Sequence, residues 1–268
     1  MRYYLWATSD LLEKSNLEPY DYIAAVEVAI WSLLLIGACP LIILRVPSST
    51  RYNARSALTS LALARIIGSA LRLATIAKPS NPGLYIAWIF FVHVGAGNLI
   101  VMGFGMLCSL SAGKDGGLSL IYWLATVVRK FMYLCGLAST IVLIVAGATR
   151  TDYRENAAGN PNIDYSLLWR VGIALLFPSM GSYLILVLLT ICFSKHIGKG
   201  AGAVIASAAI LLPLIILRLS FTVFMVFGDR SQSVGLYVVM AMVPEILAAV
   251  LVEAFGWTGT VWLLRDEV

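Results

Sequence analysis

The stretch that decides the fold spans residues 201–227 and reads AGAVIASAAILLPLIILRLSFTVFMVF. Arg218 is the one charged residue in it. A helix of about 20 consecutive apolar residues is long enough to cross the hydrocarbon core of a bilayer. We therefore predict that this stretch is a transmembrane helix.

Six further stretches meet the same length requirement. The seven predicted spans lie at about 22–44, 56–76, 84–110, 128–148, 167–193, 201–227 and 234–258. The 268-residue chain is 60% hydrophobic and 12% charged, which is roughly half the charged share of soluble domains. No Pro/Ser/Gly-rich linker divides it. The prediction is an all-α fold, one seven-transmembrane-helix bundle over residues 1–268.

Two details of this layout are less regular. Residues 118–127 are predicted to be an interfacial lead-in, because Arg129 and Lys130 follow them and adjacent cations at mid-bilayer are costly. Prolines inside membrane helices usually kink them. Kinks are therefore expected in spans 5, 6 and 7, at Pro178, Pro213 and Pro244. The longest loop, about 149–166, is predicted to be a surface cap.

The charges of the short loops predict the orientation. With an exoplasmic amino terminus, nine Lys/Arg side chains lie on the cytoplasmic side and six on the other. Cytoplasmic loops are the ones enriched in cations. We expect a multi-pass protein of the endoplasmic reticulum, with a lumenal amino terminus and a cytosolic carboxyl terminus. The basic residues form no stripe with interleaved aromatics, so nucleic acid is not an expected partner.

Charged residues inside the predicted spans are the strongest functional signal. They are Glu27, Arg65, Arg72, Arg218, Glu245 and Glu253. Each costs roughly 2.5–3.5 kcal/mol at the bilayer centre on insertion scales. Arg65, Ser69 and Arg72 are spaced by four and three residues, so they lie on one face of a helix. That face must point into the bundle.

Their depths suggest a common site. All of the set except Glu253, which lies deeper towards the cytosol, can meet in a pocket open to the exoplasmic side. His93, Asn98, Trp88 and Tyr22 are at similar levels and are candidate binding residues. Two interpretations stay open: interior ion pairs that fix helix register, or a polar binding or reaction site.

A resemblance can be stated on two runs of sequence. The residues from Tyr20-Asp21-Tyr22 to Glu27, and the run ARIIGSALRLAT at 64–75, resemble a group of fungal seven-helix integral membrane proteins with no settled function. This implies a fungal source and a bundle that carries Glu27, Arg65 and Arg72. In size and helix number the chain is also similar to the membrane-bound terpene cyclases of fungal meroterpenoid pathways.

The second resemblance implies an acid-initiated cyclisation of an apolar prenylated, possibly epoxidised, substrate in secondary metabolism. Glu245 or Glu27 would be the catalytic acid. Arg65, Arg72, Arg218, His93, Asn98, Trp88 and Tyr22 would line the substrate site. Nearby arginines favour an ionised carboxylate, which opposes acid catalysis, whereas burial favours the neutral acid.

The sequence also predicts the partners of the protein and leaves two alternative functions open. No metal or other cofactor is expected, since the chain lacks the Asp-rich motifs that ionise diphosphates. Membrane lipid is the other expected partner, and the sequence does not predict an oligomeric state. The alternatives are a carrier or binder of a lipid or small anion that uses the arginines, and a seven-helix receptor, which an exoplasmic amino terminus fits.

Overall fold

The part of the chain that the structure describes folds into seven helical segments that are long and apolar enough to span a membrane. The computed structural model describes residues 19–43, 49–78, 81–108, 119–149, 152–155, 161–164, 166–192, 201–228 and 234–266. Its apolar spans are Pro19–Cys39, Ala54–Ala77, Gly83–Leu107, Thr126–Gly147, Leu167–Cys192, Gly202–Phe227 and Val234–Ala254. The predicted all-α fold and its seven spans are confirmed.

Ten helical elements make up these spans. The first four are α2 (Pro19–Ile43), α3 (Ser49–Ala77), α4 (Pro82–Cys108) and α5 (Ser119–Thr149). The fifth span is divided into α6 (Leu167–Ala174) and α7 (Leu176–Cys192), and the sixth is α8 (Ala201–Phe227). The last consists of α9 (Val234–Tyr237), the π-helical turn η2 (Val238–Met242) and α10 (Val243–Asp266).

The interruptions follow from proline. Pro178 has no N–H to donate to the carbonyl four residues before it, and the fifth span breaks at Leu175, next to that carbonyl. Pro244 is the second residue of α10, just after η2, whereas Pro213 lies inside the continuous α8. The fourth apolar span, Thr126–Gly147, agrees with the prediction of about 128–148. Helix α5 itself begins earlier, at Ser119, so the predicted lead-in is the first part of the same helix.

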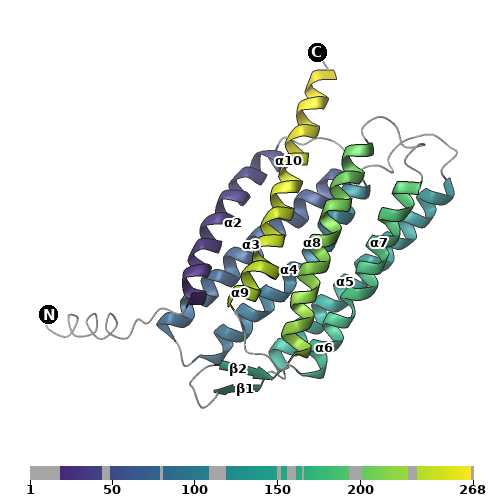
Figure 1. Ribbon diagram of the computed structural model, residues 1–268. Coiled ribbons are helices and arrows are strands. Elements are labelled where there is room, and N and C mark those ends of the chain that lie inside the picture. Colours follow the sequence, from purple (N-terminus) through teal and green to yellow (C-terminus); the bar gives the residue numbers. More distant parts are fainter. Residues whose placement is uncertain are drawn as a thin grey trace.

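A small hairpin was not anticipated. Strands β1 (Asp152–Glu155) and β2 (Pro161–Asp164) pair antiparallel, with Tyr153 opposite Ile163. They lie in the loop predicted as a cap, at the end of the bundle where α2 and α9 begin, opposite the carboxyl terminus (Figure 1). We call this the hairpin end.

The outer surface of the bundle is apolar. Leu33 and Ile36 of α2 and Leu134 and Leu137 of α5 are each at least 60% exposed. Contiguous apolar surface on this scale marks contact with a membrane or a partner. Together with the span lengths, it makes the chain an integral, multi-pass membrane protein.

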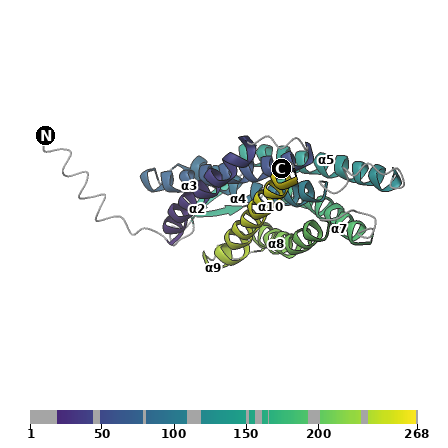
Figure 2. The same ribbon diagram turned by 90° about the horizontal axis from the view of Figure 1, so that it is seen from above.

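Helix α4 is the centre of the bundle and packs against α3, α5, α7, α8 and α10. Seen from above, α3 and α5 belong to one row of helices and α7 and α8 to the other (Figure 2). Glycine permits the closest approach: a Cβ atom at Gly105 would lie 2.6 Å from the backbone nitrogen of Ala54 in α3. Backbones this close are typical of small-residue helix interfaces in membranes.

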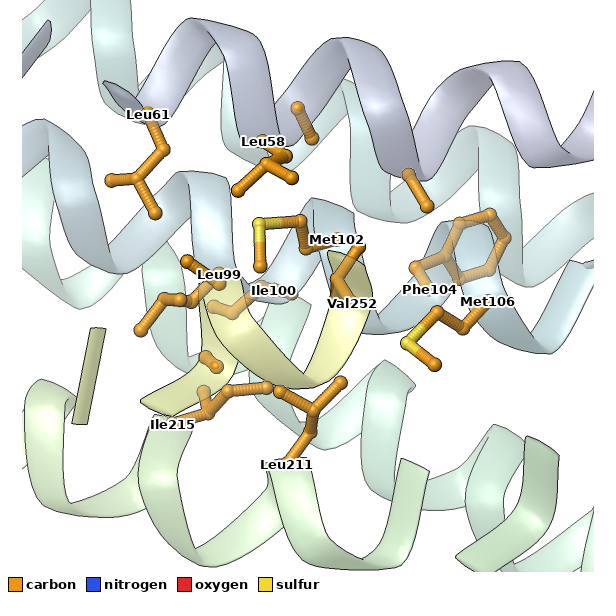
Figure 3. Packing of buried hydrophobic residues seen from close by; sticks show 14 of the residues in the cluster. Leu58, Leu61, Leu99, Ile100, Met102, Phe104, Met106, Leu211, Ile215 and Val252 are labelled. Carbon is orange, nitrogen blue, oxygen red and sulfur yellow. The ribbon is translucent and has the colours of Figure 1, made fainter. Parts of the chain in front are cut away.

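One apolar core joins the helices that carry the charged residues. Leu58 and Leu61 of α3 point towards Leu99 and Met102 of α4, with Ile215 of α8 on the other side (Figure 3). This packing fixes α3, α4, α8 and α10 relative to one another. The long polar side chains described next are therefore held on a rigid frame.

Candidate functional site

Glu245 of α10 lies between two arginines. Arg65 of α3 donates hydrogen bonds from Nε and Nη2 to the two carboxylate oxygens, and Arg218 of α8 donates from Nε to one of them. The exposures of Arg218 and Glu245 are 0%. Two guanidinium groups at this range stabilise the negative charge of the carboxylate. Glu245 is therefore best described as the anion of a buried ionic triad.

The remaining guanidinium nitrogens also have acceptors. Arg65 donates from Nη1 to the hydroxyl of Tyr237 at 3.2 Å. Arg218 donates from Nη1 to Oγ1 of Thr222 at 2.7 Å, and from Nη2 to the carbonyl of Val92. A buried polar network in which each nitrogen is satisfied is rigid and costly to disturb.

Glu27 of α2 joins this network through hydroxyl groups. It accepts a hydrogen bond from Oγ of Ser69 at 2.7 Å and another from the hydroxyl of Tyr237 at 2.6 Å. The Tyr237 hydroxyl also accepts from Arg65, so it links Glu27 to the triad around Glu245. We call Glu27, Arg65, Arg218, Glu245 and Tyr237 the charge cluster.

Arg72 forms a separate pair. Its Nε lies 3.1 Å from Oδ1 of Asp21, and both side chains are buried. Its guanidinium carbon lies 5.7, 5.5 and 5.1 Å from the ring centroids of Tyr20, Tyr85 and Trp88. The first span was predicted to begin at about residue 22, which left Asp21 outside it. This start was too late, because α2 begins at Pro19 and Asp21 in its first turn is buried.

The six charged side chains of the charge cluster and the Asp21–Arg72 pair balance. Asp21 pairs with Arg72, and Glu245 pairs with Arg65 and Arg218. Glu27 is joined to Arg65 through the Tyr237 hydroxyl, so the formal charges of these six groups sum to zero. Pairing of this kind is what allows such groups to stay inside the membrane.

Glu253 lies apart from the charge cluster, as predicted. It is two helical turns beyond Glu245 on α10, where its carboxylate approaches α2. A Cβ atom at Gly37 would lie 3.1 Å from Oε2 of Glu253. Gly37 therefore makes room for this carboxylate.

The π-turn η2 lies between the two parts of the seventh span that belong to the charge cluster. Tyr237 precedes it and Glu245 follows it by three residues. The N–H of Val243 donates to the carbonyl of Val238, five residues back, instead of four. Pro244 cannot donate an N–H at all. Such π-turns are frequent at functional sites, and this one sets the rotation between the Tyr237 and Glu245 side chains.

Gly95 of α4 leaves the space that the triad occupies. A Cβ atom there would overlap Oε1 of Glu245 and lie 2.9 Å from Nη2 of Arg65. The backbone of α4 thus forms one wall of the triad, and a residue without a side chain is required at this position.

A small cavity lies next to the charge cluster, towards the hairpin end. Its volume is about 10 Å³, enough for the centre of one water-sized sphere. Its walls are mostly aromatic or aliphatic side chains. They come from α2, α4, α8 and α9, and are Tyr20, Trp88, Ile89, Val92, His93, Phe221, Met225 and Tyr237. Tyr237 belongs both to this wall and to the charge cluster.

Two of the other four predicted binding residues line the cavity and two do not. Trp88 and His93 line the cavity, and the His93 ring centroid lies 5.3 Å from that of Trp169. Tyr22 does not reach the site: it is 61% exposed, because five residues place it about 140° round the helix from Glu27. Asn98 is half-buried on α4 and is not among the residues that line the cavity.

Sequence reasoning did not identify the role of Tyr237. It was one of many aromatic residues near the ends of spans, where a tyrosine usually belongs to the interfacial belt. Tyr237 also lies eight residues before Glu245 along the chain. Regular helical spacing does not predict whether the two side chains share a face, because the π-turn η2 between them changes the rotation of the helix.

The chain belongs to a family described as a domain of unknown function (DUF7702), whose model matches residues 17–261. That range contains all the residues of the charge cluster, the cavity and the Asp21–Arg72 pair. No curated protein matches the chain. The predicted likeness to terpene cyclases thus has no support from these comparisons.

Proposed function

We propose that this DUF7702 protein is a ligand-responsive seven-helix membrane protein, of the receptor or sensor type. The observation that carries the proposal is the double position of Tyr237. Its ring lines the cavity, and its hydroxyl joins Glu27 to Arg65. A ligand that moves this ring also changes the hydrogen bonds of the charge cluster.

The energetics suit a two-state response. Buried, paired charges are costly to leave unpaired, so a rearranged network must adopt a second fully paired arrangement and not a continuum of intermediates. The net charge of zero allows partners to exchange within the set. The cluster joins α2, α3, α8 and the seventh span, so a change of partners moves these helices relative to one another.

The seventh span has the features of a hinge. The π-turn η2 and Pro244 lie between the part that touches the cavity and the part that carries Glu245. Helix ends and interrupted turns are where hinge motion is usually absorbed. Displacement of Tyr237 would therefore be transmitted along α10 towards the carboxyl-terminal end of the bundle.

The orientation belongs to this proposal. We place the hairpin end, and with it the cavity, outside or in the lumen, and the carboxyl-terminal end of α10 in the cytosol, following the cation count of the loops. A cavity near the outer end and a response at the inner end is the arrangement that a receptor needs. The endoplasmic reticulum and the fungal source stay predictions from sequence.

Cyclisation of a prenylated substrate is a second candidate, and Glu27 favours it. Both hydrogen bonds of its carboxyl described here come from hydroxyl groups. Among the described hydrogen bonds no guanidinium group donates to Glu27, whereas two cations hold Glu245 as an anion, so Glu27 is the better candidate for the acid of the two. The cavity holds about one water-sized sphere, so such a substrate would need a much wider form of the bundle. This candidate therefore ranks second.

A built-in ligand mimic tests the receptor proposal. Met225→Trp should fill the cavity and press on Tyr237, and hydrogen exchange of the full chain in lipid nanodiscs reports the effect. We expect altered exchange of the amides in η2 and α10. Met180→Trp, a half-buried methionine in the other core, is the matched control and should leave them unchanged. Unchanged exchange in folded Met225→Trp would contradict the receptor proposal.

The cyclase is tested separately. Membranes that contain the chain are incubated with prenylated phenols and their epoxides, and isomers of unchanged mass are sought. Product that persists in a normally abundant Glu27→Gln variant would exclude Glu27 as the acid.

A further inference from the structure

We infer that the cavity takes an uncharged ligand that contains a single aromatic ring. This inference rests on the proposed function, because it names the chemical class to which the protein would respond. Three features of the site support the inference: the arrangement of the aromatic rings, the balance of charges next to the cavity, and the position of the most adaptable side chain in its wall.

Ring geometry makes the cavity selective for an aromatic group. Tyr20 meets Trp88 edge-on with ring centroids 5.8 Å apart, and it meets Tyr237 at 5.9 Å. Phe221 meets Tyr237 edge-on at 5.7 Å. Ring edges and faces are therefore both presented around the cavity. Aromatic rings prefer edge-to-face and offset neighbours at these distances, so a planar ring can continue the same pattern.

Charge balance excludes an ion. The residues that line the cavity supply no carboxylate and no guanidinium group. The charges next to it, Asp21 with Arg72 and Glu245 with Arg65 and Arg218, are already paired with one another, so a charged ligand would add an uncompensated charge to a low-dielectric site. A cation would meet Arg72, which stacks on two of the cavity residues, Tyr20 and Trp88. An anion that paired with Arg72 would compete with Asp21, whose Oδ1 lies 3.1 Å from the Nε of Arg72.

The most adaptable part of the cavity wall indicates where a ligand would enter. Met225 and Tyr20 are half-buried cavity residues, and they lie within three residues of the end of α8 and the start of α2, at the hairpin end. A methionine side chain is unbranched and adapts its shape readily. The present volume is close to that of one water, so a ring enters only when Met225 moves aside. Because the cavity is this small, we limit the inferred ligand to one ring.

Three probes with the same ring and different charge test the inference at pH 7: benzyl alcohol, benzoate and benzylammonium. Binding isotherms are measured on the full chain in lipid nanodiscs, with empty nanodiscs subtracted. We expect saturable binding of benzyl alcohol and at least tenfold weaker binding of either ion. Equal or tighter binding of an ion would overturn the proposed ligand class.

Variants of Val92 locate the site. Val92→Ile adds a methylene group to the cavity wall and should weaken benzyl alcohol binding at least fivefold, whereas Val92→Ala enlarges the cavity and should strengthen it to a similar extent. Both keep the backbone carbonyl that accepts from Arg218. Val101→Ala on the same helix, packed against the other core, is the control and should leave the affinity unchanged. Binding that is equal in Val92→Ile, Val92→Ala and wild type, or no saturable binding to wild type, would overturn the site.

The outcomes separate this inference from the proposed function. If an ion binds and the Val92 variants shift its affinity, the site stands and the ligand class is wrong. If benzyl alcohol binds as expected and hydrogen exchange in η2 and α10 stays unchanged, the ligand class stands and the receptor proposal is wrong.

Discussion

Replacement of Gly95 by alanine should destabilise the protein, although alanine is the better helix former. In an ordinary helix interior, Gly→Ala stabilises by about 0.5–1 kcal/mol. At this position the added methyl group would overlap Oε1 of Glu245 and crowd Nη2 of Arg65. These atoms cannot simply swing away, because Arg218 and Tyr237 hold the same two side chains.

The magnitude follows from the triad. Breaking a buried ion pair costs about 3–5 kcal/mol, and a partial displacement costs some fraction of that. After the gain in helix propensity, we expect a net loss of about 2 kcal/mol or more in the free energy of unfolding. Reversible unfolding of purified protein in mixed micelles, by denaturing detergent, measures it.

Gly97→Ala is the matched control. It lies two residues further along the same helix, where a Cβ atom would meet Cδ2 of Leu176 at 3.8 Å, an ordinary contact. This variant should be neutral or slightly stabilised. If Gly95→Ala and Gly97→Ala unfold at the same detergent concentration, the triad does not occupy the space beside Gly95 and the reasoning fails.

Three further predictions concern the buried charges and the orientation. Arg72→Leu should destabilise by about 3 kcal/mol, and adding Asp21→Leu should restore most of that loss in the same unfolding assay, because the double variant removes both charges. Glu245→Gln, which leaves two arginines facing each other, should lower the yield and stability of folded protein more than Glu27→Gln; the reverse order would argue against the described pairing. A reporter fused to the carboxyl terminus should be cytosolic and a tag at the amino terminus exoplasmic; a lumenal carboxyl-terminal reporter would reverse the proposed orientation.

Hydropathy alone was enough to predict the fold. Membrane helices satisfy their backbone hydrogen bonds internally, so span length and charge content determine the elements with little help from tertiary context. The stripe of Arg65, Ser69 and Arg72 was predicted to face inwards for the same reason, and all three are buried. The β1–β2 hairpin lies outside the apolar spans, where this logic does not apply.

The depth of each charged residue in the predicted membrane spans showed which residues could meet, but it did not show which of them form pairs. Depth placed Glu27 and Arg72 in one common pocket, yet Arg72 pairs with Asp21 and Glu27 bonds to hydroxyl groups. Rotation about each helix axis decides which side chains meet, and η2 changes that rotation in the seventh span.

Tyr237→Phe tests the central claim most directly, because it keeps the ring in the cavity wall and removes the hydroxyl that joins Glu27 to Arg65. Loss of one buried hydrogen-bonding group costs about 1–2 kcal/mol, roughly a tenfold change in an opening equilibrium. We predict that amide exchange in lipid nanodiscs accelerates about tenfold in α10 around Glu245 and in α3 around Arg65. Tyr183→Phe removes a different buried hydroxyl, which donates to the carbonyl of Ala208 at 2.9 Å, and should affect α7 and α8 instead. Exchange in α3 and α10 that is the same in Tyr237→Phe as in wild type would contradict the account.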